Sequence, residues 1–206
     1  MKKRPHAILF FLSALLLAAL CSGCGQEAPE KPTAGQAISQ QELGSYSHGV
    51  AVGDLHFLWT LKGDSIDVKL AAPTKGWIGV GFNPDTPENM KGANFLIGYV
   101  KGGEAQVFDH YGTEVKKHKE DVKIEGSSDV SNVSGSEQDG QTVLEFTVPL
   151  NSGDARDKPV SSQGDTIVLL AYGRSDSVVL KHRFRAIVKV NLSTGEYSVL
   201  EMGASQ

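Results

Sequence analysis

Cysteine is nearly absent from this 206-residue chain, since its two cysteines, Cys21 and Cys24, both stand near the N-terminus. The long domain after them therefore holds no disulfide, no iron–sulfur cluster and no thiolate zinc site. Segments dense in Lys and Arg are missing beyond the first four residues, and 24 acidic residues outnumber 20 basic ones. A nucleic-acid-binding surface is therefore excluded.

Long apolar runs are also missing, with one exception at residues 7–20, which is too short to span a bilayer comfortably. This run follows the basic start Met1-Lys2-Lys3-Arg4 and precedes Cys21-Ser22-Gly23-Cys24. The order of a positive, an apolar and a small-residue region is that of a secretion signal. The segment resembles a bacterial lipoprotein signal, with Cys21 where that pattern prefers Leu. The resemblance implies cleavage after Gly23 and lipidation of Cys24.

The Cys-x-x-Cys spacing of Cys21 and Cys24 has two other interpretations, a c-type haem attachment and a redox dithiol. Haem attachment requires a His immediately after the second Cys, where this chain has Gly25. A thioredoxin-like dithiol requires a strand-to-helix junction. Neither requirement is met at the end of a signal sequence.

The chain is predicted to divide into a signal at residues 1–23, a lipid-anchored tether at 24–43 and one domain at 44–202. The tether has few large apolar residues and contains two prolines. Loss of the three basic residues of the signal leaves 17 basic residues against 24 acidic ones, a net charge of −7. By analogy with lipoprotein sorting, Gly25 favours the outer membrane facing the periplasm; the alternative is the outer face of the cytoplasmic membrane. We expect membrane contact through the lipid alone.

Helical periodicity is nearly absent from the domain, which instead shows short β-rich runs separated by Gly, Asn, Asp and Ser. Several runs alternate strictly, so each is expected to bury one face. The spacing predicts an all-β, antiparallel sandwich. We expect residues 118–140, which are polar, to form a surface connection with at most one edge strand. The predicted strands are 56–62, 65–71, 77–82, 94–100, 104–111, 142–149, 166–173, 179–191 and 196–200.

Motifs of common enzymes are missing as well. The sequence contains no Gly-x-Ser-x-Gly elbow, no His-Glu-x-x-His, no phosphate loop and no pair of histidines at metal-ligand spacing. We therefore do not expect an enzyme. Four aspartates are interpreted as turn and loop residues: Asp109, Asp121, Asp154 and Asp157.

Methionine and histidine are scarce enough to single out two residues. His182 shares strand parity with Leu180 and Phe184, which points its imidazole to the apolar side and Lys181 to the other. A buried imidazole needs a hydrogen-bond partner or a metal, and by itself a hydrogen-bonded core histidine is the simpler interpretation. Met90 lies in a Pro-rich loop between two predicted strands. One Met and one inward His are too few for a copper site.

Several segments in order resemble the DOMON domain family, across residues 46–200. They are Gly76-Trp77-Ile78-Gly79-Val80-Gly81-Phe82, Met90-x-Gly92-Ala93, Phe95-Leu96-Ile97-Gly98-Tyr99-Val100, Asp109-His110-Tyr111, the strand 140–149, Ala171-Tyr172-Gly173 and His182. The resemblance implies an immunoglobulin-like β-sandwich that faces the cell exterior. Some members of the family bind b-type haem and others bind sugars.

In haem-binding members the iron is held by a Met of the Met-x-Gly-Ala loop and a late His, which correspond to Met90 and His182. This pair suits low-spin haem that transfers electrons, and non-covalent haem b needs no Cys. Lys181 is a rival ligand, because a related family pairs Met with Lys; Asn94 replaces the Asp usual in the loop. The implied partner is a redox protein or a membrane electron-transfer complex. The expected pocket wall is Trp77, Phe82, Phe95, Tyr99 and Phe184.

The alternative is a metal-free DOMON module that binds carbohydrate or another small ligand. Exposed aromatic side chains on one face would favour it. The only tryptophans, Trp59 and Trp77, lie on alternating strands and are expected to be buried.

Overall fold

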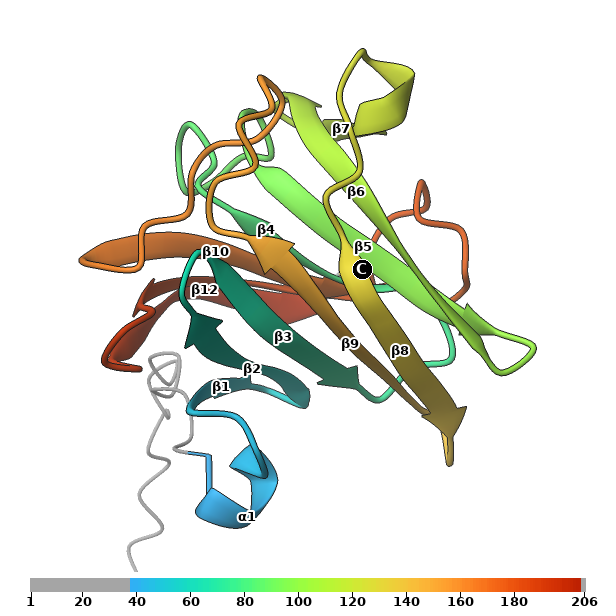
Figure 1. Ribbon diagram of the computed structural model, residues 1–206. Coiled ribbons are helices and arrows are strands. Elements are labelled where there is room, and N and C mark those ends of the chain that lie inside the picture. Colours follow the sequence, from blue (N-terminus) through green and yellow to red (C-terminus); the bar gives the residue numbers. More distant parts are fainter. Residues whose placement is uncertain (1–37, 205–206) are drawn as a thin grey trace, which may run out of the picture. The chain divides into compact units, whose positions relative to one another are not determined.

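The computed structural model describes residues 38–204 (Figure 1). The predicted signal, the lipidation site Cys24 and most of the predicted tether lie outside the described residues. Residues 38–204 contain no helix of the length and apolar character that a membrane crossing needs.

The described residues form two antiparallel sheets, which confirms the all-β sandwich. One sheet has five strands in the order β1-β2-β3-β9-β8, and the other has seven in the order β12-β11-β10-β4-β5-β6-β7. Short helical turns are α1 (Gln40–Leu43) and η1 (Asp121–Lys123). The strands are β1 (His48–Val52), β2 (Leu55–Lys62), β3 (Ser65–Ala72), β4 (Ile78–Phe82), β5 (Asn94–Lys101), β6 (Glu104–Glu114), β7 (Lys117–Glu120), β8 (Ser131–Gln138), β9 (Gln141–Pro149), β10 (Asp165–Tyr172), β11 (Phe184–Asn191) and β12 (Tyr197–Ala204).

Tight turns set the register of two hairpins that the sequence pattern alone leaves open. Asp139 and Gly140 both have positive φ, 52° and 78°, and join β8 to β9. Gly102 and Gly103, at 62° and 85°, join β5 to β6 in the same way. Such pairs match the twist of antiparallel strands, so each hairpin closes without a longer loop.

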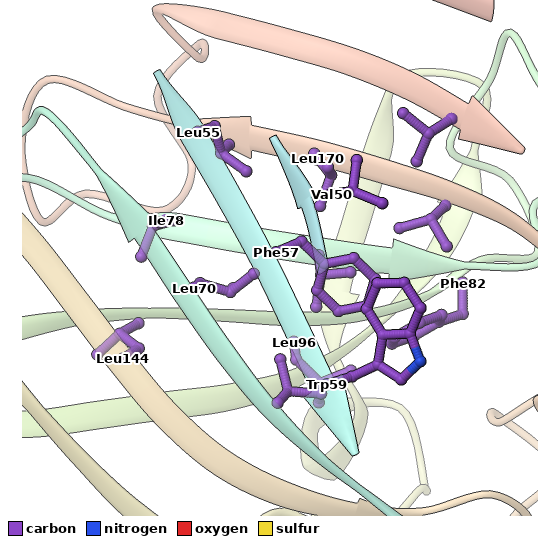
Figure 2. Packing of buried hydrophobic residues seen from close by; sticks show 14 of the residues in the cluster. Val50, Leu55, Phe57, Trp59, Leu70, Ile78, Phe82, Leu96, Leu144 and Leu170 are labelled. Atoms are coloured by element: carbon purple, nitrogen blue, oxygen red, sulfur yellow. The ribbon is translucent and has the colours of Figure 1, made fainter. Parts of the chain in front are cut away.

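The main core lies between the two sheets, where alternate residues of the strands meet (Figure 2). From the five-stranded sheet, Phe57 and Trp59 stack with ring centroids 4.8 Å apart, and Trp59 Nε1 donates to the Leu192 carbonyl at 2.8 Å. From the other sheet, Phe82 meets Phe57 edge-on at 6.2 Å. These buried rings fill the space that strict alternation on each strand predicts.

Two strands of the seven-stranded sheet are buried on both faces. Every residue of β4 is buried, and so are the first five residues of β5. The prediction that this alternating run buries only one face is therefore wrong for β4, since loops cover the sheet face that points away from the main core. This covered outer face is where the candidate site lies.

The sequence interpretation missed three strands and extended a fourth too far. β1, β7 and β8 were not predicted individually, and the single edge strand allowed within 118–140 is in fact two, with β7 and β8 at the edges of different sheets. β11 begins at Phe184, so residues 179–183 form a loop rather than the start of a strand. Asp109 lies on β6 and not in a turn.

Candidate functional site

A cavity of about 720 Å³ opens on the outer face of the seven-stranded sheet. Its size lies within the range of cofactor and ligand pockets, roughly 300–1,000 Å³. It is lined by strands β4, β5, β7, β10, β11 and β12, by the 83–93 loop, by the β6–β7 turn and by the 173–183 loop. Apolar and aromatic residues in the lining include Trp77, Met90, Phe95, Ile97, Leu169, Ala171, Val178 and Ile187, and polar ones include Glu88, Lys116, His118, Lys181, His182 and Arg185.

The floor of the cavity is a second apolar cluster, separate from the main core. Trp77, Phe95 and Ile97 are buried there, and Leu169 and Ala171 pack against them from β10. Gly79 and Gly81 occupy the same outer face of β4, and a Cβ at Gly81 would overlap the Phe95 ring. The alternating glycines of β4 therefore leave space on the outer face for the side chains of Phe95 and Ile97 from β5.

Met90 is held over this floor by backbone hydrogen bonds. Its N–H donates to the Val115 carbonyl at 3.0 Å, and its carbonyl accepts from the Ala93 N–H at 3.1 Å. The loop docks on β6 through Gly112, whose carbonyl accepts from Gly92 at 2.8 Å. A Cβ at Gly112 would overlap the Met90 carbonyl oxygen. Glycine at this position is therefore required for Met90 to approach the cavity.

An ion pair fixes the other end of the Met90 loop. Lys158 Nζ lies 2.6 Å from Asp85 Oδ1 and also donates to the Asn83 carbonyl at 3.1 Å. The Asp85 N–H donates to the Lys91 carbonyl at 2.7 Å and closes the loop. Met90 is half-buried as a result and packs against the apolar floor.

His182 lines the same cavity from a loop, so the strand position on which the prediction of its orientation rested was wrong. On β11, Phe184, Ala186 and Val188 face the main core, whereas the cavity lies on the opposite side with Ile187. His182 reaches the cavity because the 173–183 loop is held beside the start of β4 and residues 178–182 of this loop line the cavity. The Trp77 N–H donates to the Ser175 carbonyl at 3.0 Å, and the Arg183 N–H donates to the Tyr172 carbonyl at 2.7 Å. Lys181 lines the cavity as well, so the parity argument against it also fails.

The electrostatics of the site favour a neutral imidazole. Burial, followed by the positive charges of Arg185 and Lys181, lowers the pKa of His182 below its usual value. Arg185 itself forms an ion pair with Glu201. A neutral imidazole has a free lone pair, which is the form that binds a metal.

Of the five aromatic residues predicted as pocket wall, two line the cavity. Trp77 and Phe95 do so, and Tyr99 packs against the same apolar floor outside the lining. Phe82 lies in the main core, and Phe184 packs against that core, stacked on Tyr172 at 5.5 Å. Both therefore belong to the other face of the sheet, because β4 and β11 direct alternate side chains to opposite faces.

Among the titratable residues of the cavity that the sequence did not point to is His118 on β7. Its ring centroid lies 5.7 Å from that of Phe95, and its Nδ1 lies 3.0 Å from Nδ1 of the buried His110. Burial lowers the pKa of His118. The available signal was that His118 stands between two charged residues, Lys117 and Lys119, as in a strand with one inward-facing side. This signal is weak because the neighbouring residues are all polar.

Comparison with known proteins gives matches over part of the chain. MOXD1 homolog 2 of Drosophila melanogaster is 29% identical over 126 residues, which cover 61% of this chain and 16% of that protein. Human DBH-like monooxygenase protein 1 is 27% identical over 119 residues, covering 58% of this chain and 18% of that protein. The matched region thus spans less than a fifth of the length of these relatives.

Among solved structures, the fold resembles the cytochrome b domain of pyranose dehydrogenase from Coprinopsis cinerea. The TM-score is 0.52 at 13% sequence identity, and the match covers 69% of this chain and 78% of that chain. At this identity the likeness concerns the fold. The sequence itself matches the DOMON domain over residues 52–173, which include all of β2 to β10. The chain belongs to the DOMON domain family.

Proposed function

We propose that the domain binds b-type haem non-covalently in the outer-face cavity, with Met90 and His182 as axial ligands, and serves as an extracytoplasmic electron carrier. One observation carries the proposal. Met90 and His182 are 92 positions apart in the sequence, on two different loops, yet both line one cavity with an apolar floor. The family resemblance implies the same two residues.

The donor set and the surroundings fit haem. Thioether and neutral imidazole are ligands of low-spin haem iron, and the lowered pKa of His182 keeps its imidazole neutral. Trp77, Phe95 and Leu169 offer an apolar surface to a macrocycle, while Lys116 and Lys181 in the lining offer positive charge to its carboxylates.

The proposed ligand pair supports electron transfer rather than catalysis. Haem supplies a one-electron iron couple, and a thioether ligand raises its reduction potential. With Met90 and His182 both committed as ligands, the protein leaves no position for a substrate at the metal. A redox protein or a membrane electron-transfer complex is the proposed partner.

Lys181 and His118 compete with His182 for the assignment, because all three line the cavity. Lys181 is exposed, and His118 already has its Nδ1 3.0 Å from His110. His182 is half-buried with a lowered pKa, which suits a ligand better than an exposed ammonium group. Single replacement by Ala at each position separates the three: loss of the six-coordinate spectrum is expected for His182→Ala alone.

The proposed location follows from the sequence. Lipidation at Cys24 would hold the domain at a membrane, in the outer membrane facing the periplasm or on the outer face of the cytoplasmic membrane. The tether at 24–43 then separates the domain from the lipid. No part of the described domain needs to enter the bilayer for this arrangement.

The test is haemin uptake by the purified full chain, wild type against the double variant Met90→Ala, His182→Ala. The wild type should take up one equivalent and give a six-coordinate spectrum, whereas the double variant should show a high-spin spectrum and weaker binding. A matched double variant, Met202→Ala with His56→Ala, changes the same residue types outside the cavity and should behave as wild type. Uptake that is equal in all three proteins, or absent in the wild type, contradicts the proposal. In the second case, titration with sugars tests the carbohydrate-binding alternative.

A further inference from the structure

A group of aspartates gathers at one end of the sandwich, away from the haem cavity. Carboxylate oxygens of Asp109, Asp129 and Asp157 all lie within 4.8 Å of one another. They come from three segments: β6, the loop before β8, and the β9–β10 connection. In Figure 1 the turn that follows β7 and the β9–β10 connection extend to the same end of the sandwich. The topology therefore joins carboxylates that are up to 48 positions apart in the sequence.

The aspartate at the base of this group is buried and lacks a full set of partners. Asp109 is 2% exposed, and it lies opposite Leu96, so its side chain points to the inner face of the sheet. Its Oδ2 accepts from the Asp129 N–H at 3.1 Å, but its Oδ1 has no hydrogen-bond partner among the described residues. Because nearly all buried polar atoms are paired, this oxygen indicates a ligand.

A second buried carboxylate faces the same group. Asp121, at the start of η1, is fully buried, and neither of its carboxylate oxygens has a partner in the described region. Oδ1 of Asp157 is buried and unpaired in the same way, while its Oδ2 accepts from the Ser152 hydroxyl at 2.7 Å. Four oxygens on three aspartates are thus buried without a hydrogen bond.

Positive charge near these carboxylates is scarce. Arg156 is the cation that acts on Asp121, and its Nε already donates to the Ile124 carbonyl at 3.0 Å. Burial and the repulsion of neighbouring carboxylates raise the pKa of Asp109 to about 8 and that of Asp121 to about 7. A bound cation stabilises like-charged carboxylates that are held this close in a buried site. It also lowers their pKa, which burial and mutual repulsion raise.

We propose that Asp109, Asp129 and Asp157, with Asp121 beside them, form a calcium site that joins the 121–130 and 151–164 segments to β6. Carboxylate oxygens are the ligands of hard cations, and Ca²⁺ takes six to eight oxygens at about 2.3–2.6 Å in flexible geometry. Oxygens that share such an ion lie up to about 5 Å apart, as these do. The site lies on the inner side of β6, and His110 next to Asp109 points to the outer side, so calcium and haem occupy different faces.

The test is calorimetric titration of the metal-free full chain with CaCl₂, together with its melting temperature. The wild type should bind one Ca²⁺ and melt about 5 °C or more higher at saturation, the shift expected for an ion that binds only the folded state. Asp109→Asn and Asp157→Asn should each weaken binding at least about tenfold. Asp165→Asn, which removes an exposed aspartate of the Lys189 ion pair, should bind as wild type.

Folding of the variants is checked by the same measurement. Because Asn removes a repelled carboxyl group, metal-free Asp109→Asn should melt at or above the temperature of the metal-free wild type. Absence of calcium binding at millimolar concentration, equal binding in Asp109→Asn, or equal affinity for Mg²⁺ would each overturn the assignment.

Discussion

The position of Met90 is set by backbone hydrogen bonds of its loop and does not depend on the Met90 side chain. Its backbone is bonded to Val115 and Ala93, so the thioether is brought to the cavity before any cofactor is present. Preorganised donors lower the ordering cost of binding. Replacement of the side chain therefore removes the sulfur and leaves the loop intact.

The variant Met90→Ala should retain haem and lose low-spin ligation. Its reduction potential should fall by on the order of 0.1 V, a fraction of the roughly 0.8 V over which axial ligands set haem potentials. Spectroelectrochemical titration of the full chain measures both effects. Met202→Ala is the control, because Met202 lies on β12 with 38% exposure, outside the lining. An unchanged spectrum and potential in Met90→Ala would remove Met90 from the ligand set.

The contact between His110 and His118 makes a second prediction, on stability. Burial, followed by the charge of His118, lowers the pKa of His110 to about 4. The unfolded chain therefore takes up a proton near pH 6.5 that the folded chain does not, and the stability present at neutral pH is lost as the pH falls from about 7 towards about 4. Between pH 8 and pH 5 this amounts to about 2 kcal/mol.

Urea denaturation at pH 8 and pH 5 measures this loss in the wild type and in His110→Gln. Carboxyl groups titrate in both proteins. The difference between the stability that the wild type loses and the stability that the variant loses therefore gives the contribution of His110. The wild type should lose more stability than the variant. Equal losses would show that His110 is not the group that resists protonation.

At the scale of the elements, Gly112 is the residue of β6 on which the Met90 loop docks, and a substitution there tests this docking. A side chain at this position pushes against the Met90 carbonyl, and overpacking of this kind costs about 1–3 kcal/mol. Gly112→Ala should lower both the free energy of unfolding and the affinity for haem. Gly203→Ala on β12 is the matched control, since a Cβ there meets nothing within 4 Å. Weaker haem binding by Gly112→Ala, with wild-type affinity in Gly203→Ala, supports the role of the Met90 loop. Full haem affinity in Gly112→Ala contradicts it.

Strands that bury one face were predictable because alternation is unambiguous there. β2, β3 and β9 were found within a residue of their ends, since Phe57, Val68 and Phe146 all follow period two. The edge strands β7 and β8 were not identified individually, because an edge strand with polar residues on both sides carries no periodic signal. Their pairing is set by contacts with β6 and β9 that lie outside local sequence.

The site residues that belong to a family motif could be predicted from the sequence. The residues whose role depends on which sheet face they occupy could not. Met90 and His182 came from family resemblance, and the structure brings both to one cavity. The parity argument for His182 was wrong because residues 179–183 form a loop, where period two has no meaning. Phe82 and Phe184 were misplaced because an aromatic on a sandwich strand points to either face, and only the three-dimensional sheet distinguishes the two.

At the scale of the whole described domain, the seven-stranded sheet separates the two proposed binding sites. Its inner face packs in the main core, and the aspartate group lies on this inner side at one end of the sandwich. Its outer face carries the cavity. β6 serves both, since Asp109 points inward and His110 outward. A loss of calcium is therefore expected to loosen the 121–130 and 151–164 segments without removing the haem ligands.

Membrane attachment through a lipid on Cys24 is a proposal about the whole chain. Cys24→Ser should move the protein from the membrane fraction to the soluble fraction of the cell envelope, because the lipid is the proposed anchor. Fractionation of cells that express the full chain, followed by immunoblotting, measures the shift. The variant should keep the spectrum of the wild type; a variant that remains with the membrane would show that another segment holds it there.

The most direct measurement of the central claim is the visible spectrum of the full chain purified from haem-replete cells, oxidised and then reduced with dithionite. The account predicts a sharp Soret band, resolved α and β bands on reduction, and haem that acidified solvent extracts. A colourless protein that also fails to take up added haemin would contradict haem binding and leave Met90 and His182 as residues of a loop and a cavity wall.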